Sequence, residues 1–96
     1  MKAEYKIIQV TDGIKEMLLQ KNEAYGNSAL SPVNIFSKHK AHESLCARID
    51  DKLARIRNSG ITDETEDTIH DLCGYLILLI IALEDDKNKG DVHADA

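Results

Sequence analysis

Apolar side chains recur at helical spacing along three stretches of the chain. In residues 3–24 the recurring positions are Ile7, Val10, Ile14, Met17, Leu18 and Lys21. This spacing predicts a helix whose apolar stripe packs in a core. Thr11-Asp12-Gly13 interrupts the pattern, because Asp12 is a residue type that often begins helices. Two forms remain open: one kinked helix, or a short leader before a helix over 13–24.

A polar segment over 21–38 follows this first helix. Gly26-Asn27-Ser28 should end the helix, since Gly and Asn tolerate the left-handed conformation found at helix ends. Ser31-Pro32 is typical of a helix start and predicts a short helical turn through Ile35 and Phe36. The segment is either a simple connection or a ligand-binding loop, because asparagine, serine and tyrosine in loops often contact ligands.

The second helix is expected over residues 41–57. Its apolar stripe consists of Leu45, Ile49, Leu53 and Ile56. At 100° per residue, one flank of this stripe carries Arg48, Asp51, Lys52 and Arg55. The other flank carries Glu43, Ala47 and Asp50. The charges either form solvated ion pairs along the helix or provide a cationic edge and an acidic edge for a site.

Asn58-Ser59-Gly60 should end the second helix, and Thr62 or Asp63 should start the third. Asp63 and Glu66 have the spacing of a capping box. The uncharged run Leu72–Leu83 follows. It is shorter than the roughly 20 residues of a membrane span, yet it holds more apolar surface than a small three-helix monomer covers. We therefore expect it to pack against its own chain and against other copies in a homo-oligomer.

Asp71 lies next to this apolar run, where an unpaired carboxylate is costly. In an antiparallel hairpin that turns near Gly60, position 71 lies across from positions 49–52. Its partner should therefore be Lys52, Arg48, or a metal shared with Asp50 or Asp51. Gly74, one turn later, would let another backbone or a ligand approach.

The composition sets further bounds. Ninety-six residues form one domain, which we place over 1–84, with a disordered tail over 85–96. A net charge of −5 argues against a broad surface for long nucleic acids. The N-terminus lacks the apolar segment of a signal peptide and no stretch is long enough to span a membrane, so a cytoplasmic protein is expected.

The cysteines and histidines give weak signals for chemistry. Cys46 and Cys73 occupy helical positions without a CxxC pair, so we expect small buried side chains. His39 and His42 are three residues apart and could share a metal if helical. No further ligand at useful spacing supports such a site, and solvated link residues are the simpler interpretation.

Four motifs in order resemble a known family. They are KNEAYGNS at 21–28, SPVNIFSK at 31–38, RIDDKLARI at 48–56 and EDTIHDLCGYL at 66–76. Together they resemble nucleotide modification associated domain 1, a family of small proteins found mostly in phages and bacteria. That family looks distantly similar to the all-helical MazG-type nucleoside triphosphate pyrophosphatases, which bind magnesium through acids on two antiparallel helices.

The resemblance implies an all-α, MazG-like fold. With the helix pattern and the apolar run described above, we expect a small bundle of three to four helices with a long antiparallel hairpin, in an oligomer. The resemblance also implies a phosphorylated nucleotide bound between the long helices. The loop side of that site would be Asn22, Tyr25, Gly26, Asn27 and Ser28. The helix side would be Arg48, Asp51, Lys52 and Arg55, with Asp67 and Asp71 as the acids of the last helix.

The acids depart from the MazG pattern. Those enzymes carry an ExxE pair on one helix and an ExxD pair on the next. Here Glu43 and Asp50 are seven residues apart, and only Glu64 and Asp67 have ExxD spacing. Two-metal chemistry needs acids that converge on ions about 4 Å apart.

Three hypotheses follow for the function. In the first, cationic side chains hold phosphates without turnover, Tyr25 or Phe36 stacks on a base, and no cofactor is needed. A phage protein of this kind could sequester a nucleotide second messenger in the host cytoplasm and so oppose antiviral signalling. In the second, Mg²⁺ bound by Glu43, Asp50, Asp67 and Asp71 supports a nucleoside triphosphate pyrophosphatase. In the third, the charges pair only with one another in a structural oligomer.

Overall fold

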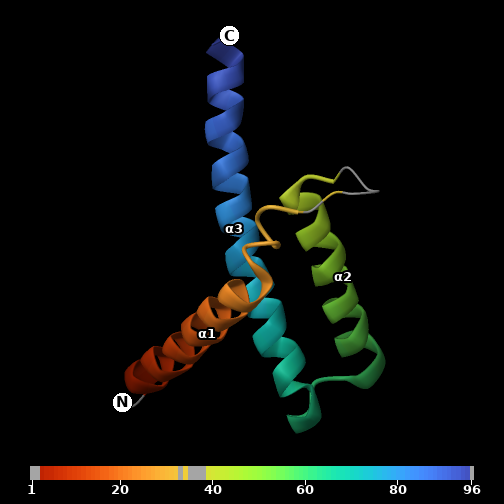
Figure 1. Cartoon of the computed structure of the whole chain (residues 1–96). Helices are drawn as coiled ribbons and strands as arrows, with labels where there is room; N and C mark the ends of the chain where they lie inside the picture. Colours follow the sequence, from red (N-terminus) through yellow and green to blue (C-terminus); the bar gives the residue numbers. More distant parts are fainter. Residues whose placement is uncertain (1–2, 33, 35–38, 96) are drawn as a thin grey trace.

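The computed structural model describes residues 3–32, 34 and 39–95, with side chains through Asn88. Its elements are α1 (Ala3–Tyr25), α2 (Ala41–Ser59), the short 3-10 helix η1 (Asp63–Thr65) and α3 (Glu66–Asp95). Within these ranges the structure is all-helical, as predicted. α2 lies antiparallel beside the first half of α3, and α1 crosses α3 (Figure 1). The antiparallel hairpin therefore forms the centre of the molecule.

α1 is one helix through the predicted interruption. The Thr11 hydroxyl donates to the Ile7 carbonyl at 2.7 Å, so this polar side chain is satisfied inside the helix. The helix ends at the predicted break. Gly26 and Asn27 have φ of 60° and 64°, and the Asn27 amide donates to the Asn22 carbonyl at 3.2 Å. This left-handed pair closes the helix and turns the chain towards α2.

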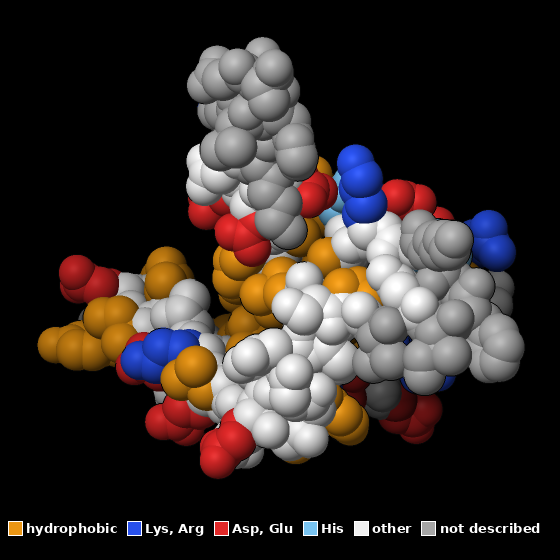
Figure 2. All heavy atoms as spheres, turned by 45° about the horizontal axis from the view of Figure 1, so that its top comes forward, with side chains coloured by type: hydrophobic (Ala, Val, Ile, Leu, Met, Phe, Trp, Pro, Cys, Tyr) orange, Lys and Arg blue, Asp and Glu red, His pale blue; other side chains and the backbone are white. Residues whose placement is uncertain are grey.

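The predicted core stripe of α1 is only partly buried in the single chain. Ile14 is buried, whereas Ile7 is 63% exposed and Val10 is 48% exposed. The core prediction is wrong for those two residues, because α1 crosses α3 with its second half while its first half projects as an arm (Figure 1). Hydrophobic side chains are visible on this arm in Figure 2.

α2 begins and ends close to its predicted bounds, and the next helix begins at Thr62, one of its two predicted starts, although the capping box differs. The cap is Thr62, whose hydroxyl accepts from the Glu64 amide at 3.2 Å. The Thr65 hydroxyl accepts from the Thr62 amide at 2.9 Å. The capping box is therefore Thr62 with Thr65, one residue before the predicted Asp63 with Glu66. The threonine side chains are short enough for their hydroxyls to form the hydrogen bonds that close the tight 3-10 turn before α3.

α3 continues to Asp95. The composition instead predicts a tail without regular structure from residue 85. A helix that is already formed gains one backbone hydrogen bond for each residue added, so a polar sequence can extend it. The predicted helical turn through Ile35 and Phe36 lies outside the described residues. No helix in the described part of the chain is long and apolar enough to cross a membrane.

The buried core is small. Among the described side chains, the buried hydrophobic residues are Ile14, Leu45 and Ala82. Cys73 is half-buried, but Cys46 is exposed, contrary to the prediction that both are buried. In the α2 stripe Leu45 is buried and Ile49 and Ile56 are half-buried, but Leu53 is 50% exposed. Position 46 lies about 100° round the helix from Leu45 and therefore away from this contact. Much of the apolar run of α3 also remains at the surface.

Candidate functional site

A pocket of about 320 Å³ lies between the three helices and the turn that follows α1. This volume is at the small end of the range for ligand sites, about 300–1,000 Å³. Its lining is Met17, Leu18, Lys21, Asn22, Tyr25, Ser28, Ala29, Arg48, Asp71, Gly74, Tyr75 and Leu78. The pocket thus combines apolar walls and two tyrosines with cationic and amide side chains.

Asp71 is held by two lysines from two different helices. Its Oδ2 lies 3.3 Å from Lys52 Nζ of α2, and its Oδ1 lies 3.2 Å from Lys21 Nζ of α1. Burial raises the pKa of Asp71, but the hydrogen bonds from Lys21 and Lys52 outweigh this effect and hold the pKa below its usual value. The predicted partner Lys52 is confirmed, and Lys21 is an additional one.

The three charges differ in their exposure. The Lys52 side chain is only 15% exposed, and Asp71 is 27% exposed, whereas Lys21 is 50% exposed. Lys52 therefore balances the carboxylate from behind. Lys21 and Arg48 reach the pocket, so its local charge is positive although the whole chain carries −5. A concave site with this charge attracts an anion.

Gly74 lets α1 approach α3 beside the pocket. A Cβ atom at this position would meet Leu18 Cδ2 at 3.0 Å and Met17 Cε at 3.3 Å. The sequence predicts that Gly74 admits another backbone or a ligand. The group that approaches is instead the side-chain layer of α1, and this contact places Lys21 and Asn22 one turn further along α1 at the pocket.

The structure brings many of the predicted binding residues together. Asn22, Tyr25, Ser28, Arg48 and Asp71 line the pocket, and Lys52 contacts it through Asp71.

The other predicted binding residues lie elsewhere. Gly26 and Asn27 form the turn behind the lining residues. Asp51 and Arg55 are exposed on α2 and do not line the pocket. Phe36 lies outside the described residues.

Lys21 and Tyr75 are site residues that sequence reasoning missed. Lys21 occupies a position of the α1 apolar stripe, and a cation in such a stripe signals a buried acid nearby. Tyr75 follows Gly74 in the apolar run of α3, where it is expected to be a packing residue. The feature that could have identified Tyr75 as a site residue is its position one turn after Asp71.

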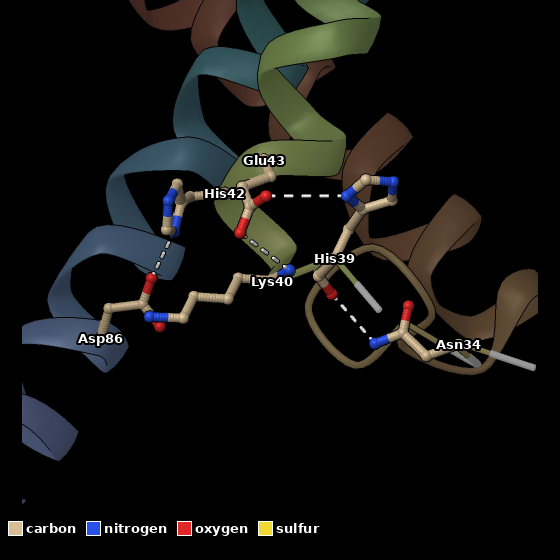
Figure 3. A network of polar contacts seen from close by, with 6 residues as sticks. All are labelled: Asn34, His39, Lys40, His42, Glu43 and Asp86. Carbon is tan, nitrogen blue, oxygen red and sulfur yellow. Dashed lines mark hydrogen bonds and ion pairs between the residues drawn. The ribbon is translucent and has the colours of Figure 1, made fainter. Parts of the chain in front are cut away.

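The acids predicted for a metal are not gathered. The Glu43 carboxylate accepts from the Lys40 amide at 3.3 Å and lies 3.6 Å from His39 Nδ1 at the start of α2 (Figure 3). The backbone hydrogen bond from Lys40 is the main reason that the pKa of Glu43 is lowered. Asp50 and Asp67 are exposed. In residues 3–32, 34 and 39–88 no three His, Cys, Asp or Glu side chains form a possible metal site.

The two histidines also have separate partners. His42 Nδ1 contacts Asp86 of α3, whereas His39 lies on the other side of Glu43 (Figure 3). His39 is exposed, as expected for a solvated link. His42 is instead half-buried, and its contact with Asp86 links the start of α2 to α3.

Comparisons with protein-family models, curated proteins and solved structures gave no match for this chain. The site itself combines an enclosed lysine–aspartate pair, two cations that face a cavity, and two tyrosines beside them.

Proposed function

We propose that the chain binds a phosphorylated nucleotide in the pocket between α1, α2 and α3, without turnover. The observation that carries this proposal is the charge arrangement around Asp71. Lys52 and Lys21 both contact the Asp71 carboxylate, so three cations face one acid here; Arg48, together with the half-exposed Lys21, can bind the phosphate. Charge-assisted hydrogen bonds of this kind are among the strongest polar contacts in proteins.

The remaining lining residues suit the other parts of a nucleotide. Tyr25 is at the rim and Tyr75 is half-buried, so either ring can stack on a base. Asn22 and Ser28 supply hydrogen bonds to a base edge, and Asp71 can accept from a ribose hydroxyl. The small volume favours one nucleotide unit within each pocket. The resemblance to nucleotide modification associated domain 1, with its MazG-like fold, agrees with this ligand class.

We also propose a biological role and an assembly. A protein that holds a nucleotide without converting it lowers the free concentration of that nucleotide. In an infected host cell, this activity would sequester a second messenger of antiviral signalling. A homo-oligomer would carry several such pockets, and the large exposed apolar surface supports assembly of this kind.

The second candidate is a magnesium-dependent nucleoside triphosphate pyrophosphatase. The observation in its favour is the carboxylate of Asp71 in the pocket, together with the ExxD spacing of Glu64 and Asp67. In that mechanism Asp71 and nearby acids would hold Mg²⁺, which would bind the triphosphate and activate water.

Calorimetric titration with AMP, ADP, ATP, GTP and cyclic dinucleotides, with Mg²⁺ or with EDTA, tests the first proposal. Binding that persists in EDTA, without pyrophosphate release in the Mg²⁺ samples, is the expected result. Arg48→Ala should weaken binding by about tenfold or more, as expected for a charged hydrogen bond worth about 1.5–3 kcal/mol. Arg57→Ala is the matched control on the same helix, because Arg57 is exposed and does not line the pocket.

Asp71→Asn separates the two candidates. Asparagine removes the negative charge but keeps a hydrogen-bond acceptor. Metal-free nucleotide binding should therefore survive in this variant, whereas a pyrophosphatase would lose a metal ligand and its turnover.

Mass spectrometry of the small molecules released by denaturing protein purified from infected cells would identify the natural ligand. Unchanged nucleotide affinity in Arg48→Ala would refute the assignment of the site.

A further inference from the structure

Most of the large apolar residues of α3 that remain exposed lie on one side of the helix, whereas Ile77 and Ile81, which are 37% and 36% exposed, lie further round it. Ile69, Leu76, Ile80 and Leu83 are 38%, 45%, 58% and 50% exposed. With the half-buried Cys73 they occupy positions 69, 73, 76, 80 and 83, which alternate in spacing between four and three. These five residues, here called the α3 seam, fall within an arc of about 80° at 100° per residue. Alternation of this kind is the heptad pattern of helices that pack against another helix.

The α3 seam is separate from the pocket. Asp71, Gly74 and Leu78 line the pocket and lie on the opposite side of α3, where α1 crosses. Asp86, the partner of His42, lies about 90° away from that side and marks the flank of α3 that faces α2. All five residues of the seam stay exposed or half-buried against the described part of the chain.

The surface of the molecule is also too large for a compact monomer. The exposed area is 7596 Å², whereas a folded monomer of 10.7 kDa exposes about 5,500 Å². The radius of gyration is 15.8 Å, against about 12.5 Å for a compact chain of this length. The excess of about 2,000 Å² exceeds the roughly 800 Å² that each partner contributes to a standard interface.

The charges at the ends of the seam indicate what fits on it. The heptad spacing continues to Glu66 at one end and to Lys87 at the other. A parallel copy would place Glu66 against Glu66 and Lys87 against Lys87. In an antiparallel pair, Lys87 of each chain would lie beside Ile69 of the other chain, near its Glu66. These two side chains have opposite charges, so their proximity is favourable.

We propose that two copies of this chain pack their α3 helices antiparallel along the α3 seam, Leu76 of one copy meeting Ile80 of the other around a two-fold axis. Such an interface is self-complementary, because each chain presents the same surface. It leaves both pockets open on the far sides of the pair. The inference rests on exposure and spacing and is independent of the nucleotide proposal.

The first test is the mass of the full chain in solution, measured by sedimentation velocity. Wild type should have the mass of a dimer or of an assembly of dimers, that is, an even multiple of 10.7 kDa. Ile80→Asp should reduce the mass to one chain, because it places a charge at the centre of the interface. Ile61→Asp is the control, since Ile61 is 76% exposed in the loop before η1. A monomeric wild type, or an unchanged mass in Ile80→Asp with its circular dichroism intact, overturns the proposal.

The second test is the orientation of the two helices. In a background of Cys46→Ser and Cys73→Ser, one sample carries Ile69→Cys and the other carries Lys87→Cys. The two samples should form a mixed disulfide after they are combined and oxidised. Ile69→Cys alone should not cross-link, because its two sulfurs would be separated by 18 residues of helix, about 27 Å. Self-cross-linking of Ile69→Cys would establish a parallel pair and overturn the antiparallel arrangement.

Discussion

Lys52 Nζ lies 3.3 Å from Asp71 Oδ2, and this is the most enclosed ion pair among the described residues. It joins α2 to α3 across the hairpin, behind the wall of the pocket. Its two side chains are 15% and 27% exposed, so solvent screens their attraction less than at the surface. The pair therefore acts in two ways: it fixes the hairpin, and it neutralises the acid that would otherwise repel an anion.

Lys52→Met should weaken both the fold and the site. Loss of the pair should lower the free energy of unfolding by about 1–2 kcal/mol, between the values for exposed and buried pairs. Lys21 would then balance Asp71 alone, and nucleotide affinity should fall by roughly fivefold, or about 1 kcal/mol. Urea denaturation and calorimetric titration measure the two effects.

Arg55→Met is the control for this substitution, because it removes the same charge from an exposed position on the same helix. It should change the unfolding free energy by no more than about 0.5 kcal/mol. Equal effects of the two substitutions would show that the net charge of α2 matters and the ion pair does not.

Asp71→Asn should alter how stability depends on pH. The folded-state pKa of Asp71 is lowered, so its stabilising effect is complete above the ordinary aspartate pKa of about 3.9. The effect is lost as the pH falls through the lowered folded-state value. At pH 7 the variant should be less stable by about 1 kcal/mol. Below pH 4 the difference from wild type should shrink, as urea denaturation at several pH values would reveal.

Asp51→Asn is the matched control for pH, since Asp51 is exposed on α2 and outside the pocket. It should leave stability within about 0.5 kcal/mol of wild type at pH 7 and at pH 3. A destabilisation by Asp71→Asn that stays constant down to pH 2 would contradict the role of the charge.

Tyr25→Ala should reduce affinity for nucleotides but not for inorganic phosphate. Stacking of a base on an aromatic ring contributes about 1–3 kcal/mol, which is roughly 5-fold to 150-fold in the dissociation constant. Tyr25 is 69% exposed at the pocket rim, so the fold should tolerate the change. Tyr5→Ala removes an equally exposed tyrosine from the far end of α1 and should leave nucleotide affinity unchanged.

Gly13→Ala and Gly74→Val should have opposite effects on stability. A Cβ atom at Gly13 meets nothing within 4 Å, so alanine should stabilise α1 by up to about 1 kcal/mol. At Gly74 even the first added carbon lies 3.0 Å from Leu18. Valine there should push α1 away from α3 and cost about 1–3 kcal/mol. Thermal denaturation of both variants checks the signs, and a stabilising Gly74→Val would contradict the close crossing.

The helices and one contact of the site could be predicted from sequence. Periodicity and helix-ending residues located α2 within two residues of its observed end, and the hairpin register placed Lys52 among the possible partners of Asp71, beside Arg48 and a metal. These features depend on residues close in sequence or joined by a short turn. The short cap was misplaced by one residue, because Thr62 and Asp63 are both good helix-capping residues.

The position of α1 could not be predicted in the same way. The stripe of α1 continues on both sides of Thr11-Asp12-Gly13, and nothing in it shows that the contact with α3 ends near Ile14. Lys21 was therefore read as part of a stripe, although it reaches Asp71 fifty residues away. The long polar segment between α1 and α2 leaves many crossing angles open. Tyr75 could not be identified as a site residue for the same reason, because the pocket beside it exists only where α1 crosses α3.

The scarcity of buried residues gives the pocket a final consequence. Ile14, Leu45 and Ala82 are the buried hydrophobic residues among the described side chains, and the walls around the pocket enclose space instead of atoms. A molecule bound there becomes part of the protein's interior and holds three helices at once. If a nucleotide binds there as proposed, its supply would set how long each copy resists proteolysis in the cell, and the amount of this protein would rise and fall with that nucleotide.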